Sequence, residues 1–139
     1  HEYNMLTNPG FESGSTGWTL WENTSVINSN AHSGKKCIGT GTEAGGCGQI
    51  INASPNKSYY CEVWGKVGSG QTGGVYIECQ NASGQVLQTF SLTSFTSASY
   101  VKRSTTFTTP ANTAKLQVYT WKDTTGGYFY ADDFIVRPN

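Results

Sequence analysis

Two stretches of this chain, residues 75–80 and 116–121, alternate in a way that strongly constrains its fold. One set of alternate positions is apolar or small, and the other carries rings, amides and one carboxylate. The second set consists of Tyr76, Glu78, Gln80, Gln117, Tyr119 and Trp121. Because successive side chains of a strand point to opposite faces of its sheet, the pattern predicts strands with one face on a core.

Aromatic residues on the other strand face indicate a ligand. An exposed ring loses the benefit of burial unless a partner covers it, and flat rings beside Gln and Glu suit a sugar. The expected sugar contacts are Trp21, Trp64, Tyr76, Glu78, Gln80, Gln88, Gln117, Tyr119 and Trp121. An alternative for Trp64 and Tyr76 is a cross-strand pair that only stabilises the sheet. We therefore expect a sugar-binding module and not an enzyme.

Composition restricts both the fold class and the ligand class. Charged residues make up 13% of the 139 residues, and the formal net charge is +0. Nucleic acids and anionic membrane surfaces attract basic proteins, so neither partner is expected, and no apolar run approaches the roughly 20 residues of a membrane span. Gly, Ser, Thr and Asn are abundant, and no window has helical periodicity. We expect one all-β domain over residues 1–139, a β-sandwich jelly roll of two antiparallel sheets.

The cysteine spacing predicts two disulfides. The chain has no CxxC pair and only two histidines, which argues against a metal site built from the cysteines. Cys37 and Cys47 flank one Gly-rich turn, and Cys61 and Cys79 flank another, so the expected bridges are Cys37–Cys47 and Cys61–Cys79 across two hairpins. Four cysteines permit three pairings, and the sequence does not choose among them. Disulfides imply an oxidising compartment, so we expect a secreted, extracellular protein.

Carboxylates at the two ends of the chain suggest a calcium site. Glu12 follows a tight turn, and Asp132 and Asp133 lie in the last expected strand. A sandwich that pairs its ends could bring these oxygens together, and loop oxygens near Ser33 could complete the six to eight ligands that Ca²⁺ takes. Solvated carboxylates are the alternative.

Paired carboxylates offer a catalytic alternative. If Cys61 faces Cys79, Glu62 lies opposite Glu78, and two carboxyls about 5 Å apart suit a retaining glycosidase. Such a pair would repel, and no long loop is evident that could cover it and expel water. A shift of one step would set Glu62 against Gln80 instead. A small glycoside hydrolase or lyase is therefore the weaker hypothesis.

The turn at residues 81–84 also predicts a hairpin that sets Glu78 opposite Gln88.

Several motifs, taken in order, resemble carbohydrate-binding modules of the family 4/9/16/22 type, which are β-sandwich jelly rolls appended to secreted polysaccharide-degrading enzymes. They are Asn8-Pro9-Gly10-Phe11-Glu12 with Gly17-Trp18, Ala31-His32-Ser33-Gly34, Gly48-Gln49-Ile50, Pro55-Asn56-Lys57-Ser58-Tyr59 and Ala131-Asp132-Asp133-Phe134. Two further stretches resemble family 16 most, namely Trp18-Thr19-Leu20-Trp21 and Trp121-Lys122-Asp123-Thr124.

The resemblance implies a function and a site. Modules of family 16 bind β-1,4-linked glucose or mannose chains, so Trp21 and Trp121 are expected to stack on sugars, with Gln88 as a hydroxyl partner and Glu78 where a second amide is usual. It also implies a structural Ca²⁺ ion held by Glu12 and Asp132, with Asp133 and Ser33 nearby. We expect a monomer that binds cellulose-type or mannan-type polysaccharide and is attached to a catalytic domain. A calcium-stabilised adhesion or spacer domain, which would bind no glycan, is a further alternative.

Overall fold

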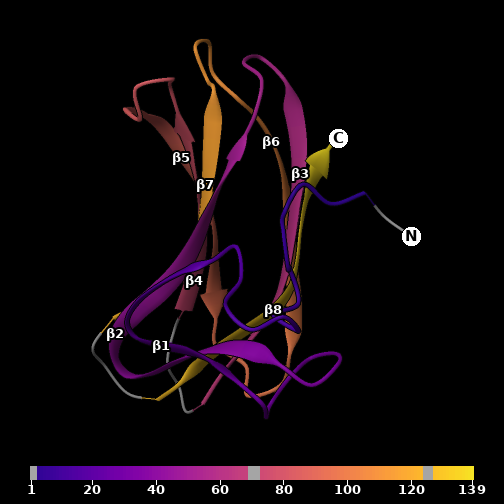
Figure 1. The fold of residues 1–139 in the computed structure, drawn as a ribbon, viewed down its shortest axis with the longest axis vertical. Coiled ribbons are helices and arrows are strands. Elements are labelled where there is room, and N and C mark those ends of the chain that lie inside the picture. The colour runs from indigo at the N-terminus through magenta and orange to yellow at the C-terminus, as the bar shows by residue number, and fades with distance from the viewer. Residues whose placement is uncertain (1–2, 69–72, 124–126) are drawn as a thin grey trace.

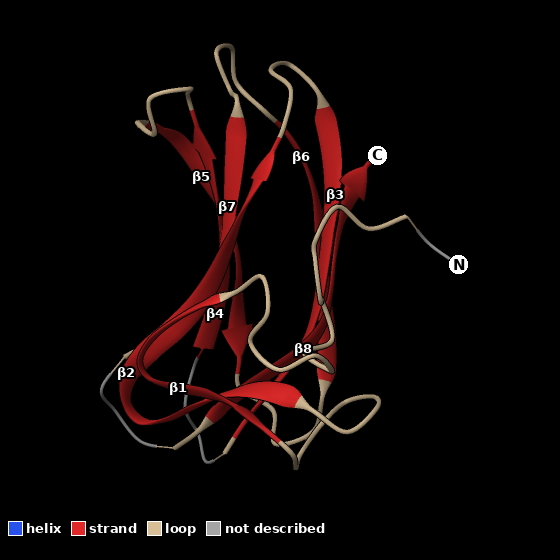
Figure 2. Ribbon diagram, in the orientation of Figure 1, coloured by secondary structure: helices blue, strands red, loops and turns tan. Residues whose placement is uncertain are grey.

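Strands account for all of the regular structure that the computed structural model describes, and no helix occurs there (Figure 2). The described residues are 3–68, 73–123 and 127–139, apart from the side chains of residues 93 and 94. The strands are β1 (Thr19–Ile27), β2 (Cys37–Asn52), β3 (Ser58–Val67), β4 (Gly73–Gln80), β5 (Val86–Phe95), β6 (Val101–Thr108), β7 (Lys115–Lys122) and β8 (Phe129–Pro138). No described segment forms a helix long and apolar enough to cross a membrane. The expected all-β class is confirmed.

The strands form two antiparallel layers joined through β2. The order of hydrogen-bonded neighbours is β5-β4-β7-β2-β8-β3-β6, and β1 pairs with β2 along its length. Residues 45–52 of β2 pair with β7, whereas residues 38–40 pair with β8. Figure 1 shows β2 curving from the layer of β4, β5 and β7 toward the layer of β3 and β8. The expected sandwich of antiparallel sheets is confirmed, and one strand belongs to both sheets.

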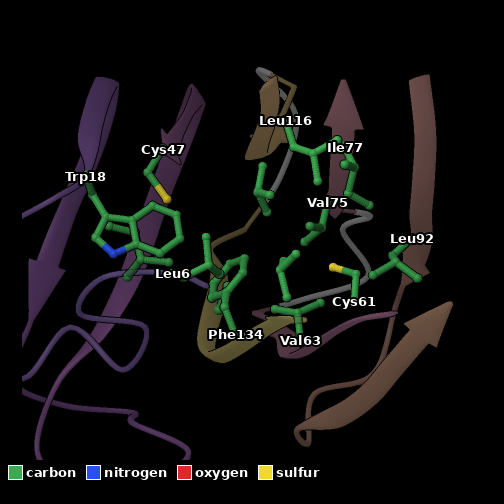
Figure 3. Packing of buried hydrophobic residues seen from close by; sticks show 14 of the residues in the cluster. Leu6, Trp18, Cys47, Cys61, Val63, Val75, Ile77, Leu92, Leu116 and Phe134 are labelled. Carbon is green, nitrogen blue, oxygen red and sulfur yellow. The ribbon is translucent and has the colours of Figure 1, made fainter. Parts of the chain in front are cut away.

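The core lies between the two layers. Val75, Ile77 and Leu116 point inward from one layer and meet Val63 from the other (Figure 3). All four side chains are fully buried, and burial of such a side chain contributes about 1.5–3 kcal/mol relative to leaving it exposed. Alternation along β4 and β7 therefore sets one face of each strand against the core, as the sequence pattern predicts.

An aromatic cluster packs between the N-terminal segment and β8. The ring of Phe11 lies 4.8 Å from that of Trp18 and 5.9 Å from that of Phe134, measured between centroids. The Trp18 indole N–H donates to the backbone oxygen of Asn8 at 2.9 Å, so its polar atom is satisfied although the side chain is buried. Residues from both ends of the chain thus share one core.

The expected disulfide hairpins are wrong. Cys37 and Cys47 lie on one continuous strand, β2, where they face Ile27 and Leu20 of β1. Cys61 lies in β3 and Cys79 in β4, and these two strands belong to different layers and do not pair. All four cysteines are free and buried. Glycine is common in turns but can also lie within a strand, and the segment between Cys37 and Cys47 continues as part of β2.

Candidate functional site

Four rings project from the outer face of one layer. Trp21 comes from β1, Tyr76 from β4, and Tyr119 and Trp121 from β7. In the registers of the sheet, Trp21 faces Gly46 of β2, Tyr119 faces Tyr76, and Trp121 faces Gly74. All four side chains are partly exposed. The structure therefore brings Trp21 and Trp121 onto the same layer although 100 positions separate them in the sequence.

Glycines of β2 leave room for the tryptophan rings. A Cβ atom on Gly48 would lie 2.6 Å from Cη2 of Trp21 and 3.0 Å from Cβ of Tyr119. A Cβ atom on Gly46 would lie 3.2 Å from Cε3 of Trp121 and would collide with the backbone oxygen of Thr120. Any side chain at these positions would displace a ring or the backbone, so the rings rest on bare main chain.

Three of the four rings contact one another as well as the sheet. The centroids of Tyr76 and Tyr119 are 5.2 Å apart and their planes differ by 28°, which is a stacked arrangement. The Trp21 ring stands edge-on to Tyr119, with centroids 6.2 Å apart and planes at 73°. Beyond Trp21, β1 has a register irregularity between Glu22 and Thr24, where Glu22 has a φ of 54°. Such bulges bend a strand and turn its side chains.

Polar side chains continue the same face beyond the rings. Glu78 of β4 faces Gln117 of β7. The Gln80 amide donates to Glu78 Oε1 at 3.3 Å and to Gln117 Oε1 at 3.4 Å. Burial raises the pKa of Tyr119, and the nearby charge of Glu78 and a hydrogen bond to it raise this pKa further. We call these residues, together with the four rings, the aromatic–amide face: Trp21, Tyr76, Glu78, Gln80, Gln117, Tyr119 and Trp121.

Two of the predicted sugar contacts lie elsewhere. Gln88 faces Cys79, while Thr89 faces Glu78, so the hairpin register differs by one residue from the expected one. A shift of one position moves a side chain to the other face of the sheet, and Gln88 is therefore not part of the aromatic–amide face. Trp64 belongs to β3 in the other layer, where its ring stacks on His32 at 4.0 Å with planes 16° apart. The alternative pairing of Trp64 with Tyr76 is also wrong, because β3 and β4 are not neighbours.

The carboxylate pair proposed for a glycosidase does not form. Glu62 of β3 faces Ser104 and Ile135, and Glu78 of β4 faces Thr89 and Gln117. Glu62 accepts a hydrogen bond from the Tyr60 hydroxyl at 2.6 Å, and its Oε1 atom lies 3.9 Å from Lys102 Nζ. The two carboxylates thus sit on different layers and cannot act on one glycosidic bond.

The residues predicted to bind calcium gather around the loop before β2. Glu12 accepts hydrogen bonds from the backbone N–H groups of Lys35 and Lys36, at 3.0 and 2.9 Å. Asp132 accepts from the backbone N–H groups of His32 and Ser33, at 2.9 and 3.2 Å. The predicted sandwich therefore does bring its two ends to one place.

Asp133 lies in the same cluster. It accepts a hydrogen bond from Ser33 Oγ at 2.7 Å and lies 2.6 Å from His32 Nδ1. Burial, followed by the charge of Asp133, raises the pKa of Asp132 to about 6. In residues 3–68, 73–123 and 127–139, no group of three or more His, Cys, Asp or Glu side chains is arranged to hold a metal ion.

Sequence reasoning missed the glycines of β2 and one apolar neighbour. Ile50, which is 55% exposed, faces Gln117 at the margin of the aromatic–amide face. The signal was present in the spacing of Gly46, Gly48 and Ile50, since alternate residues of a strand share one face. The prediction of a turn between Cys37 and Cys47 hid the fact that these glycines and Ile50 share one strand face.

Residues 3–126 match the family described as "Carbohydrate binding domain". A keratan-sulfate endo-1,4-beta-galactosidase from Sphingobacterium multivorum is 34% identical over 96% of this chain and 31% of its own length. Exochitinase 1 from Streptomyces olivaceoviridis is 31% identical over 96% of this chain and 22% of its own length. The chain thus spans less than a third of these relatives. A solved structure named Family 16 Carbohydrate Binding Module-2 has a TM-score of 0.83 and 26% identity, covering 96% of this chain and 99% of that one.

Proposed function

The chain belongs to the carbohydrate-binding domain family, and from this premise we propose that its aromatic–amide face binds a β-1,4-linked glucan or mannan chain without cleaving it. The observation that carries the proposal is the gathering of Trp21, Tyr76, Tyr119 and Trp121 on one outer face. The expected resemblance to modules of the 4/9/16/22 type is confirmed by the family match and by the family 16 structure.

The face offers both kinds of contact that a sugar chain needs. Trp21 and Trp121 present partly exposed rings, and stacking on a ring contributes about 0.5–1.5 kcal/mol in comparable aromatic contacts. Glu78 and Gln117 are partly exposed next to those rings and offer polar atoms to hydroxyl groups, while the buried Gln80 amide hydrogen-bonds to both of them. Affinity should be modest, because each hydroxyl gives up water for every hydrogen bond that it makes.

A binding role fits the arrangement of the acidic residues better than catalysis does. A glycosidase needs two carboxyl groups on opposite sides of one bond. Glu78 has an amide and a tyrosine hydroxyl for neighbours, and Glu62 lies on the other layer. The hydrolase or lyase hypothesis therefore loses the residues on which it depended.

We further propose that the chain serves as a targeting module of a larger secreted enzyme. The two curated relatives carry names of glycoside-cleaving enzymes, and this chain spans only 31% and 22% of them. An insoluble polysaccharide is met outside the cell, and a module that binds it holds an attached catalytic domain at high local concentration. A single exposed face of this kind requires no second copy, so the module would act as a monomer.

A structural Ca²⁺ ion is a separate proposal, also supported by the family resemblance. Glu12, Asp132, Asp133 and Ser33 offer hard oxygen atoms around one loop, as Ca²⁺ requires. Asp132 is fully buried next to Asp133, and a divalent cation would offset the repulsion between them. Backbone N–H groups take several of these oxygens, so the loop would have to exchange some of those bonds for the ion.

Affinity electrophoresis in gels containing glucomannan or hydroxyethylcellulose tests the binding proposal. We expect Trp121→Ala to lose its retardation by the polymer while its melting temperature stays close to that of the unaltered protein. Trp64→Ala is the matched control, because it removes a tryptophan of similar exposure from the other layer. Retardation that survives in Trp121→Ala and disappears in Trp64→Ala would place the binding site on the layer of β3 and contradict the proposal.

Calcium is tested separately by thermal unfolding with added Ca²⁺ and with a chelator. We expect the chelator to lower the melting temperature by several degrees, because an ion that binds only the folded state stabilises it. Glu12→Gln should abolish the response. An unchanged melting temperature in the unaltered protein would remove the ion from the proposal and leave the sugar site in place. Ion binding and glycan binding are thus measured independently. A domain that responds to the chelator and binds no glycan would be a spacer domain and not a binding module.

A further inference from the structure

Among the described residues, Glu78 has no cationic partner in the middle of the aromatic–amide face. Its side chain is partly buried. His32 pairs with Asp133 and Lys102 pairs with Glu62, and neither ion pair involves this face. Lys115 is the one described cation that alternates onto the outer face of β4 or β7, and it faces Gln80 rather than Glu78. The Glu78 carboxylate is therefore surrounded on this face by neutral aromatic and amide side chains.

The neighbours of Glu78 on this face include two tyrosine rings and the amides of Gln80 and Gln117. Tyr76 precedes it by two positions on the same strand face, and Tyr119 faces Tyr76 on the neighbouring strand, where the charge of Glu78 contributes to its raised pKa. Gln80 donates to Oε1 only at a long 3.3 Å, and a carboxylate has about four lone-pair positions in all. Acceptor capacity thus remains for a ligand. A carboxylate beside the faces of aromatic rings favours a cation, because both the charge and the ring quadrupole attract it.

We propose that Glu78 binds the ammonium group of a 2-amino-2-deoxy sugar, so that the preferred ligand of this module is a β-1,4-linked chain with free amino groups. The inference rests on the proposed sugar-binding function of the same face and names its substrate class. The tryptophan rings supply stacking that any β-1,4 chain can use, and Glu78 supplies the discrimination.

The same charge defines which chains are rejected. A sulfated or uronic chain would bring like charge to Glu78, which costs affinity and supplies specificity. An N-acetylated chain lacks the cation and gains only neutral contacts. A chain with hydroxyl groups at the same carbon can hydrogen-bond to Glu78 but has no charge to pair with it. A partly exposed ion pair next to an aromatic ring corresponds to about a fivefold to tenfold gain in affinity.

Three hexasaccharides with the same β-1,4 backbone test the proposal, because they differ only at carbon 2. Cellohexaose carries a hydroxyl group there, the chitin hexamer an acetamido group, and the glucosamine hexamer an amine. Titration calorimetry at low salt and mildly acidic pH, where the sugar amines carry their charge, should give the glucosamine hexamer about a fivefold to tenfold advantage over cellohexaose. Added salt should reduce that advantage in the unaltered protein while leaving cellohexaose binding nearly unchanged.

Glu78→Gln keeps the size and shape of the side chain and removes its charge, so the ratio of the two affinities should fall to about one. Glu62→Gln, a partly buried carboxylate on the other layer, is the matched control and should keep the full ratio. Equal affinities in the unaltered protein, a salt-independent advantage, or an advantage that survives in Glu78→Gln would each overturn the proposal. Binding of cellohexaose without any gain from the amine contradicts this inference alone. Failure to bind any of the three hexamers would contradict the proposed function itself.

Discussion

The two outer faces of the sandwich are built from the same kinds of residue and differ in how those residues are partnered. On the face of β3 and β8, Trp64 stacks on His32, Arg137 lies over the Tyr60 ring at 4.4 Å, and Lys66 lies over Tyr130 at 5.3 Å. On the aromatic–amide face three of the rings contact one another, the tryptophans lie over bare backbone, and Glu78 pairs with no cation among the described residues. An outward ring therefore indicates a ligand only where the protein itself leaves that ring uncovered.

Removing the two tryptophans together gives the strongest test of this contrast. The double variant Trp21→Ala/Trp121→Ala loses both stacking surfaces, each contributing about 0.5–1.5 kcal/mol, so affinity for a β-1,4 hexasaccharide should fall by about thirtyfold. Titration calorimetry measures the loss, and circular dichroism checks that the fold persists. Binding that stays within twofold of the unaltered protein would show that these rings do not touch the ligand.

A change beneath the rings should have a smaller effect. Gly48→Val would place side-chain atoms where Trp21 and Tyr119 lie, since even a Cβ atom would be 2.6 Å from the Trp21 ring. The displaced ring should cost about fivefold to tenfold in affinity for the same hexasaccharide, close to the loss of one stacking contact. If affinity were unaffected while the melting temperature fell, Gly48 would serve only the packing of the sheet.

On the face of β3 and β8, removing a ring should lower stability and leave affinity unchanged. Trp64→Ala removes a ring that packs on His32, so we expect stability to fall by about 1–3 kcal/mol, less than for a fully buried tryptophan. Affinity for the hexasaccharide should stay within twofold. Chemical denaturation gives the stability and titration gives the affinity. A loss of affinity without a loss of stability would make both faces binding surfaces and end the contrast.

The inner faces of both layers give a change in stability that appears only at alkaline pH. Burial raises the pKa of Cys47 and of Cys61 to about 12, whereas an exposed thiol has a value of 9.0. As pH rises above 9, the unfolded chain releases these protons first, so the stability present below that pH is progressively lost. Denaturation midpoints across this range measure the loss. A protein whose cysteines were bridged would show no such thiol contribution, and a thiol reagent would find no sulfhydryl groups after unfolding.

The sequence was sufficient for the features that depend on local alternation. It predicted the strand class, the inward face of β4 and β7, and the placement of Trp21 and Trp121 on outward positions. It also predicted that Glu12 and Asp132 would approach each other, and both contact the loop before β2. These outcomes follow because period two and the closure of a sandwich leave few alternatives.

Features that depend on which strands pair could not be predicted. The expected bridges and the Glu62–Glu78 pair both assumed that strands adjacent in sequence are adjacent in space, but β3 and β4 belong to different layers. Alternation placed Trp64 on an outer face without indicating which layer that face belonged to. For Gln88, the register irregularity between Cys79 and Gln80 moved the residue to the opposite face, and nothing in the local sequence marks it.

The strand β2 gives the molecule a single cooperative unit, since it pairs with β7 at one end and β8 at the other. Neither sheet keeps all its backbone partners once β2 detaches, so melting of one sheet should propagate to its neighbour in one transition. Evolution can therefore exchange ligand contacts around Gly46 and Gly48 while β3 and β8 hold the remainder of the same strand in place. The layer of β3 and β8 thus keeps the module folded while substitutions on the aromatic–amide face change which ligand it binds.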